Sequence, residues 1–175
     1  MAFGRDVPVA EIEAIVVSVP TGAIGVESDA QAEIHSWGDD VMLIAYGSLF
    51  PTCVKAADVL RKEGLSVGVI NARFAKPLDR ATLLRAVEEL PLVVTVEEGT
   101  LEGGFGSALL EAANAARLDT RHVVRLGIPD RFVEHGERGE LLADLGLDAN
   151  GIADAVRRAL GRDVPVEHGL ASGGR

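Results

Sequence analysis

The stretch VMLIAY, residues 41–46, is a continuous apolar run that begins after Asp40 and ends at Gly47. A run of this length without alternating polar residues is typical of a strand that is covered on both faces, as in a parallel sheet between two layers of helices. Residues 51–63 continue with a helical pattern, because Pro51 suits a first helical turn and apolar residues recur on one stripe. The run therefore predicts the first strand–helix unit of an α/β protein.

The same alternation continues along the chain. Asp79 and Asp148 each precede an apolar helical stripe and are expected to cap a helix N-terminus. Strands that alternate with helices predict a three-layer α/β/α fold, in which a mostly parallel sheet of about five strands lies between helices joined by right-handed crossovers. The further elements expected are strands at 65–70, 92–98 and 121–128, and helices at about 80–90, 105–116, 138–145 and 149–160.

The two ends of the chain do not share this alternation. Residues 1–37 are interrupted by prolines and glycines and predict an extended entry segment, with one or two strands, that would follow a preceding domain absent from the chain. Residues 38–161 form the predicted domain, and residues 162–175, which have few apolar side chains, predict a flexible tail. We therefore expect one domain with an extension at each end.

Composition excludes several classes of function. The 175-residue chain is 47% hydrophobic, and its 17 basic and 27 acidic residues give a formal charge of −10, which argues against nucleic acid or an anionic membrane as a partner. No apolar run approaches the roughly 18 residues of a membrane span, and residues 1–11 lack the pattern of a signal peptide, so we expect a cytoplasmic protein. The one cysteine, Cys53, is expected to be a packed core thiol.

Two segments would present backbone N–H groups at a helix start, where anions can bind. In YGSLFPT, residues 46–52, the hydroxyls of Ser48 and Thr52 are expected to cap the helix that follows. In EEGTLEGGFGS, residues 97–107, the glycines lack the spacing of a dinucleotide loop and follow the third strand rather than the first, so close packing of helix on sheet explains them better. The histidines, which form no recognisable catalytic set, are His35, His122, His135 and His168.

The segment INARFAKPLDR, residues 70–80, brings two cations to the carboxyl end of a predicted strand. Ligands of open parallel sheets bind beyond the carboxyl ends of the strands, and the guanidinium of Arg73 would suit a phosphate there through two parallel hydrogen bonds. The alternative is an ion pair between Arg73 and Glu97 or Glu98 on the neighbouring strand. The residues alone leave both interpretations open.

Several motifs together resemble one family. They are YGS, NARFAKPLD, TVEEGTLEGGFGS, GIPDRF, EHG and LGLDANGI, within residues 38–160. In this order and spacing they resemble the C-terminal domain of the 1-deoxy-D-xylulose-5-phosphate synthases, which are thiamine-diphosphate enzymes of the non-mevalonate isoprenoid pathway. R-F-x-K-P-L-D and V-E-E-G are shared with transketolases and with the beta subunits of 2-oxo acid dehydrogenases, whereas G-I-P-D-R-F, H-G and L-G-L point to the synthases. The opening FGRDVP resembles the family segment R-Y-P-R-G only weakly, and Phe3 and Arg5 receive no role.

The resemblance implies roles for few residues of this chain. Arg73 takes the place of the family arginine that contacts the phosphate of glyceraldehyde 3-phosphate, and Lys76 is expected to pack or pair at the domain junction. Thiamine diphosphate and magnesium bind to two preceding domains in the family, so no cofactor, metal or catalytic residue is expected in this chain alone. Residues 38–40, Gly-Asp-Asp, are expected to form a turn with no metal role.

The function that the resemblance implies is that of a third domain, detached or separately encoded, of a synthase that converts pyruvate and glyceraldehyde 3-phosphate to 1-deoxy-D-xylulose 5-phosphate and CO2. Inactive alone, it would supply a domain or dimer interface and one phosphate contact to the missing domains or to a subunit that carries them. The alternatives are a non-catalytic binding module of the same fold, or the matching domain of a transketolase or 2-oxo acid dehydrogenase beta subunit. A homodimer is expected, because the apolar Ile128, Phe132 and Val133 have no evident partner.

Overall fold

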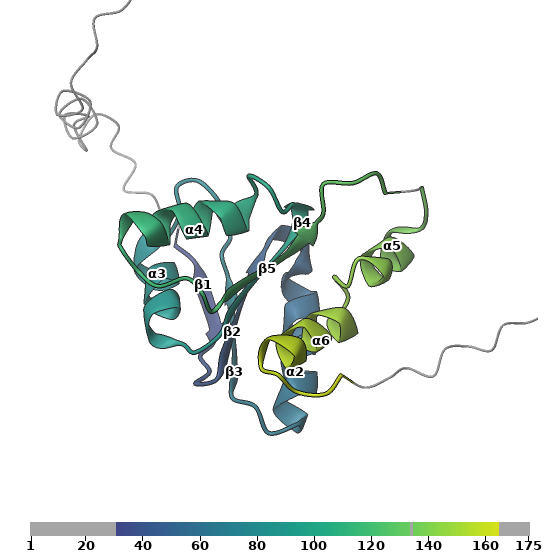
Figure 1. The fold of residues 1–175 in the computed structure, drawn as a ribbon, viewed down its shortest axis with the longest axis horizontal. Helices are drawn as coiled ribbons and strands as arrows, with labels where there is room; N and C mark the ends of the chain where they lie inside the picture. Colours follow the sequence, from purple (N-terminus) through teal and green to yellow (C-terminus); the bar gives the residue numbers. More distant parts are fainter. Residues whose placement is uncertain (1–30, 134, 165–175) are drawn as a thin grey trace, which may run out of the picture.

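The computed structural model describes residues 31–133 and 135–164. Within them the chain alternates strands and helices in the predicted order (Figure 1). The strands are β1 (Glu33–Ser36), β2 (Val41–Tyr46), β3 (Val67–Asn71), β4 (Val93–Thr100) and β5 (Val123–Ile128). The helices are the short 3₁₀ helix η1 (Gly47–Leu49) and the α-helices α2 (Phe50–Lys62), α3 (Arg80–Glu89), α4 (Phe105–Ala115), α5 (Arg138–Asp144) and α6 (Ala149–Ala159).

The strands of the described residues form one sheet in the order β1-β3-β2-β4-β5. β2 pairs in parallel with both β3 and β4, and β5 pairs in parallel with β4, whereas β1 runs antiparallel to β3. The predicted fold class, with a mostly parallel sheet of about five strands, is therefore confirmed. Because the four parallel strands run the same way, their carboxyl ends lie along one edge of the sheet, where ligands of such folds bind.

Alternate side chains of the central strand β2 enter two separate cores. Leu43 points into a core with α2 and α6, whereas Met42 and Ile44 point into a core with α3 and α4. All three side chains are fully buried, as the continuous apolar run at 41–46 predicts. The result is three layers, with α2, α5 and α6 on one face of the sheet and α3 and α4 on the other (Figure 1).

Local hydrogen bonds define the helix ends. Asp79 caps α3 by accepting a hydrogen bond from the Thr82 N–H at 3.1 Å, and Asp148 caps α6 by accepting one from the Gly151 N–H at 2.8 Å. Both predicted N-caps are confirmed. Gly64, with a φ of 86°, ends the turn after α2 in a conformation that favours glycine. Each of these contacts is local, so the sequence suffices to predict it.

The entry segment contributes β1 to the sheet. This strand lies within residues 1–37 and forms the sheet edge beside β3, so the segment contains one of the predicted strands. Residues 1–30, with Phe3 and Arg5, and residues 165–175, with His168, lie outside the described part of the chain. The domain boundaries at 38 and 161 stay predictions.

Cys53 lies in the core between α2 and the sheet and is fully buried. Burial raises the pKa of its thiol to about 12, because the thiolate would lose its hydration. The thiolate is the reactive form of cysteine, so this side chain is unreactive at neutral pH. The prediction of a packed core thiol is confirmed.

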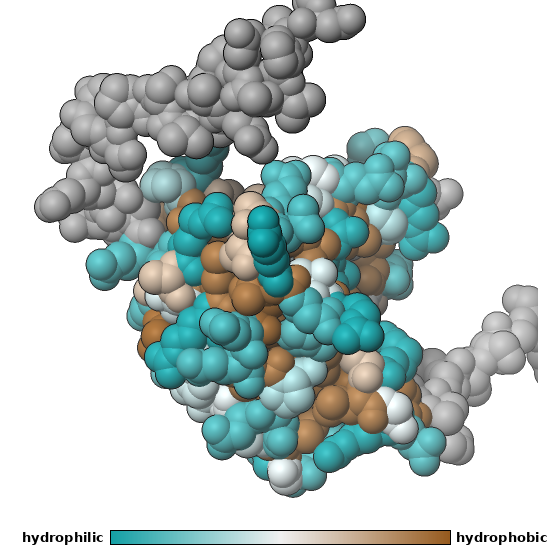
Figure 2. Space-filling model, turned by 60° about the vertical axis from the view of Figure 1, so that its left-hand side comes forward, coloured by the Kyte–Doolittle hydropathy of each residue, from teal (hydrophilic) through white to brown (hydrophobic). Residues whose placement is uncertain are grey.

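Large apolar side chains are exposed at few places on the described surface. They are Ile34, Phe74 and Phe132. With the α3–α4 side turned forward, apolar patches alternate with hydrophilic residues (Figure 2). None of the described helices combines the length and the apolar character that crossing a bilayer requires.

Candidate functional site

Arg73 lies just beyond the carboxyl end of β3, with its side chain exposed. It adopts a positive φ of 57°, and its N–H donates a hydrogen bond to the Asn71 side chain at 3.2 Å. This backbone conformation is uncommon for a residue other than glycine. The guanidinium lies over the ring of Phe74, 5.4 Å from the ring centroid. Arg73 is therefore held at the sheet edge by an aromatic ring and a backbone turn.

Glu97, one of the two carboxylates considered as a partner of Arg73, forms hydrogen bonds with other groups instead. Its side chain is 3% exposed and accepts hydrogen bonds from the N–H groups of Phe105 at 2.7 Å and Gly106 at 2.9 Å. These residues begin α4, so the Glu97 carboxylate occupies the end of the helix that favours anions. This role was not predicted. Its signal in the sequence is a glutamate at the end of a buried strand, eight residues before the helix begins.

The glycines of residues 97–107 let α4 approach the sheet closely, as predicted. A Cβ on Gly106 would lie 2.6 Å from Thr95 Oγ1, and a Cβ on Gly104 would lie 2.2 Å from the carbonyl oxygen of Thr100. Both distances are too short for a real Cβ, so glycine is required at both positions. Because Glu97 already bonds the first N–H groups of α4, the loop does not present them to a dinucleotide.

Ser48, Glu98 and Arg138 form a hydrogen-bonded cluster where β2 and β4 end. The Ser48 hydroxyl donates to Glu98 at 2.5 Å, Arg138 Nε donates to Glu98 at 2.8 Å, and Arg138 Nη2 donates to both partners. The hydrogen bonds from Arg138 and then Ser48 hold the pKa of the Glu98 carboxyl below its usual value. The predicted helix-capping role of Ser48 and Thr52 is wrong, because α2 begins without a side-chain cap and Ser48 binds across the sheet edge instead.

The second carboxylate considered for Arg73 is thus engaged by Arg138. Within the described ranges 31–133 and 135–164, neither Arg73 nor Lys76 has an ion-pair partner, and both side chains are exposed. The alternative of an ion pair between Arg73 and Glu97 or Glu98 is therefore not formed. The phosphate role of Arg73 and the junction role of Lys76 stay predictions.

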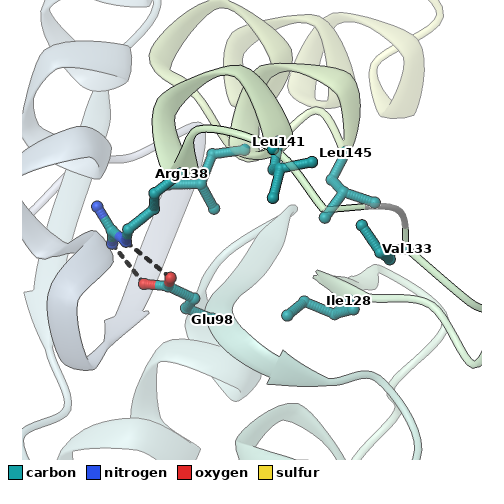
Figure 3. Close-up of a pocket in the computed structure, with 8 residues that line it drawn as sticks. Glu98, Ile128, Val133, Arg138, Leu141 and Leu145 are labelled. Carbon is teal, nitrogen blue, oxygen red and sulfur yellow. Dashed lines mark hydrogen bonds and ion pairs between the residues drawn. The ribbon is translucent and has the colours of Figure 1, made fainter.

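An apolar cavity of about 210 Å³ opens beside the cluster, between α5 and the ends of β4 and β5. Figure 3 shows Leu141 of α5 and Leu145, which directly follows this helix, facing Ile128 and Val133 across this space, with the ion pair of Glu98 at one side. We call this hollow the α5 cavity. Its lining combines one charged pair with apolar side chains, which suits an apolar group more than a phosphate.

Other polar residues have structural roles. His122 Nε2 donates to the Val87 carbonyl oxygen at 2.8 Å and ties β5 to α3, while His35 lies on β1. Asp40, in the turn before β2, accepts a hydrogen bond from the Ser66 N–H at 2.7 Å. In the part of the chain that the structure describes, no group of three or more potential metal ligands comes together.

A family model described as the transketolase C-terminal domain matches residues 30–152. The match covers the whole sheet and every helix except the end of α6. The chain belongs to the transketolase C-terminal domain family.

The relatives with similar sequences are more specific than the family model, because they share one name. A 1-deoxy-D-xylulose-5-phosphate synthase of Synechococcus sp. (strain JA-2-3B'a(2-13)) is 49% identical over 127 residues, which are 73% of this chain and 19% of that protein. The synthase of Halothermothrix orenii is 40% identical over 181 residues, covering 98% of this chain and 27% of that protein. The chain is thus similar to the C-terminal domain of such a synthase, as the motifs predict. It spans about a fifth to a quarter of the length of these relatives.

Solved structures agree on the fold. One described as "Split gene transketolase, inactive beta4 tetramer" matches with a TM-score of 0.67 and 31% identity, over 75% of this chain and 43% of that chain. The transketolase of Campylobacter jejuni matches with a TM-score of 0.53 and 20% identity, over 74% of this chain and 18% of that chain. The second likeness concerns the fold alone.

Proposed function

We propose that this chain acts as the third domain of a 1-deoxy-D-xylulose-5-phosphate synthase, either detached or as a separately encoded subunit. The complete enzyme would convert pyruvate and glyceraldehyde 3-phosphate to 1-deoxy-D-xylulose 5-phosphate and CO2, in the cytoplasm, for isoprenoid synthesis. The observation that carries this proposal is the 49% identity to a synthase over 127 residues. The split-gene transketolase chain is less similar, at 31% identity, which favours the synthase over the transketolase alternative.

Thiamine diphosphate and magnesium would be held by the other domains of the complete enzyme. The described residues do not suit the cofactor, because the glycine-rich start of α4 has its N–H groups bonded to Glu97. We therefore expect no saturable binding of thiamine diphosphate with magnesium to the chain alone in a calorimetric titration. Binding with micromolar affinity would contradict the division of roles between this chain and its partner domains.

The contribution of this chain to the substrate site would be Arg73. It stands beyond the carboxyl edge of the sheet, its side chain is exposed, and it has no ion-pair partner among the described residues. A phosphate of glyceraldehyde 3-phosphate bound to the partner domains would be a suitable ligand. Lys76, also exposed, would contact the partner domain at the junction.

Alone, the chain would be inactive and would associate with itself. The similar solved structure of a split-gene transketolase, which is described as an "inactive beta4 tetramer", supports both parts of this proposal. The partners would then be the missing domains, or a subunit that carries them, and a second copy of this chain. We expect the copy–copy contact to form without the other domains.

The kinetics of Arg73→Ala in a complex reconstituted with the remaining synthase domains would test the substrate role. Loss of a bidentate, charge-assisted contact worth about 1.5–3 kcal/mol should lower kcat/KM for glyceraldehyde 3-phosphate roughly ten- to a hundredfold. The KM for pyruvate should hardly change. Lys76→Ala is the matched control, because it removes a nearby cation and should weaken assembly rather than aldehyde use. Unchanged aldehyde kinetics with Arg73→Ala would refute the phosphate contact.

A further inference from the structure

The backbone at Arg73 is strained. The Phe74 N–H donates a hydrogen bond to the Ala72 carbonyl oxygen at 2.6 Å, and Arg73 between them has a φ of 57°. Such a bond, with a positive φ at the central residue, defines the form of γ-turn that is rarer and more strained than its inverse. Backbone strain persists only where the surrounding structure over-determines it, and it concentrates at functional sites. The residues around Arg73 must therefore stabilise this turn.

The base of the turn is fixed by the sheet. Asn71, the last residue of β3, pairs with Ala45 of β2 on one side and with Glu33 of β1 on the other. The Ala72 side chain is fully buried in the core with α3 and α4, and the Ala72 N–H donates to the Ala45 carbonyl oxygen at 2.9 Å. The turn therefore begins from a point that the two neighbouring strands hold in place without any help from Arg73.

The Asn71 side chain connects this fixed base to Arg73. Its Oδ1 accepts the hydrogen bond from the Arg73 N–H at 3.2 Å, and within residues 31–133 and 135–164 this N–H has no other acceptor. Asparagine side chains bond the backbone two residues further on in this way and so stabilise turns. Loss of Asn71 Oδ1 would thus free the backbone of Arg73, while β3 itself stays paired on both sides.

The turn also determines where the Arg73 guanidinium lies. Phe74, whose N–H closes the turn, places its ring beneath the guanidinium, with 5.4 Å between the ring centroid and the Arg73 Cζ atom. A cation and an aromatic ring attract each other at this distance. The backbone conformation thus fixes both the start of the Arg73 side chain and the ring on which it rests. A side chain ordered in advance binds its ligand more tightly, because less entropy is lost on binding.

We propose that Asn71 is a positioning residue of the substrate site and acts through Arg73. Asn71 Oδ1 holds the Arg73 backbone in the γ-turn, so the guanidinium is ordered beyond the carboxyl edge of the sheet before a phosphate arrives. Asn71 does not need to touch the substrate itself. This inference deepens the proposed function, and it rests on that proposal for the contact between Arg73 and the phosphate of glyceraldehyde 3-phosphate.

Kinetics of Asn71→Ala in the complex with the remaining synthase domains test the proposal. The variant should lower kcat/KM for glyceraldehyde 3-phosphate roughly three- to tenfold, because Arg73 must then be ordered during binding. For glyceraldehyde, the same aldehyde without its phosphate, kcat/KM should hardly change. A purely structural role would lower both values together. Asn114→Ala is the matched control, since Asn114 is exposed near the end of α4, and it should leave both values unchanged.

A double variant shows whether Asn71 acts through Arg73. In a chain that already carries Arg73→Ala, Asn71→Ala should cause no further loss of kcat/KM for glyceraldehyde 3-phosphate, because the side chain that it positions is gone. An equal loss from Asn71→Ala with and without Arg73 would contradict the proposal. Circular dichroism spectra identical to wild type would show that each variant is folded.

Nuclear magnetic resonance of the chain alone tests the positioning without any activity. The Arg73 backbone N–H should have an order parameter of about 0.85 in wild type and below about 0.6 in Asn71→Ala. Asn71→Asp, which keeps an acceptor oxygen at the same place, should restore the wild-type value. This variant is confined to the resonance experiment, because its negative charge would repel a phosphate.

The outcomes separate this inference from the proposed function. Reduced kcat/KM with Arg73→Ala but not with Asn71→Ala would overturn the positioning role and leave the phosphate contact standing. Unchanged aldehyde kinetics with Arg73→Ala would overturn the phosphate contact and, with it, the positioning of Arg73 for substrate. An Arg73 N–H that stays equally rigid in Asn71→Ala would overturn the positioning role on its own, whatever the activity of the complex.

Discussion

Replacing Glu97 by alanine should destabilise the domain strongly. The variant removes the acceptor for the N–H groups of Phe105 and Gly106, at 2.7 and 2.9 Å, and leaves both groups at the buried start of α4. A hydrogen bond to a charged group contributes about 1.5–3 kcal/mol, and a buried donor left without an acceptor adds its desolvation cost. Because the two bonds share one carboxylate, their effects are not fully additive. We expect a loss of about 3–5 kcal/mol in the free energy of unfolding.

Urea denaturation followed by circular dichroism measures this loss, and the adjacent glutamate provides the control. Glu98 bonds to Arg138, but its side chain is 29% exposed and that of Arg138 is 57% exposed. An ion pair this open to solvent contributes about 0–1 kcal/mol, so Glu98→Ala should change the free energy of unfolding by no more than this. Glu97→Gln, which keeps one acceptor oxygen, should lie between the two. A loss below about 1 kcal/mol for Glu97→Ala would refute the view that Glu97 holds the start of α4.

Three further predictions concern stability and reactivity. Gly106→Ala should lower the free energy of unfolding by about 1–3 kcal/mol in urea denaturation, because its Cβ would lie 2.6 Å from Thr95 Oγ1. In the double variant, Thr95→Ala should restore part of this free energy, because it removes the atom that clashes. Additive losses of the two single variants would contradict the clash. Arg157→Leu should destabilise the domain by about 1–3 kcal/mol at pH 7, because it removes the pair with Glu63. The hydrogen bond from Arg157 lowers the pKa of Glu63 in the folded chain, so the pair stabilises the fold above the unfolded pKa near 4.5, and this stabilisation is lost as the pH falls through the lower folded pKa. The difference in free energy of unfolding between wild type and Arg157→Leu should therefore shrink in acid, and a constant difference would contradict this. Cys53 should react with a thiol reagent only on global unfolding, because it is fully buried with a pKa of about 12; fast reaction of the native chain at pH 7 would argue against it.

Most of the fold could be predicted because its signals are local. The apolar run at 41–46 identifies a strand buried on both faces, and Asp79 and Asp148 identify helix starts from a carboxylate followed by an apolar stripe. Alternation of strands and helices then restricts the architecture to a parallel sheet between two helical layers. None of these inferences depends on the order of the strands in the sheet.

The site could be predicted only in part, because its contacts depend on strand order. Ser48 and Glu98 are 50 residues apart in the sequence and meet because β2 and β4 are paired in the sheet. Helix-capping statistics alone assign Ser48 to the wrong partner. Arg138 joins them from α5, 40 residues beyond Glu98, and the short helix offers no sequence signal for that contact. The ion pair considered for Arg73 was excluded only when both of its candidate carboxylates were found with other partners.

Product formation in a reconstituted mixture tests the central claim most directly. The chain would be combined with the thiamine-diphosphate-binding domains encoded beside it or, in their absence, with a Halothermothrix orenii synthase truncated before its C-terminal domain, since that protein is 40% identical to this chain. Pyruvate, glyceraldehyde 3-phosphate, thiamine diphosphate and magnesium would be supplied, and 1-deoxy-D-xylulose 5-phosphate would be measured by mass spectrometry. The proposed function predicts product from the mixture and none from either component alone. Product from the truncated partner by itself, or none from the mixture despite a stable complex, would contradict it.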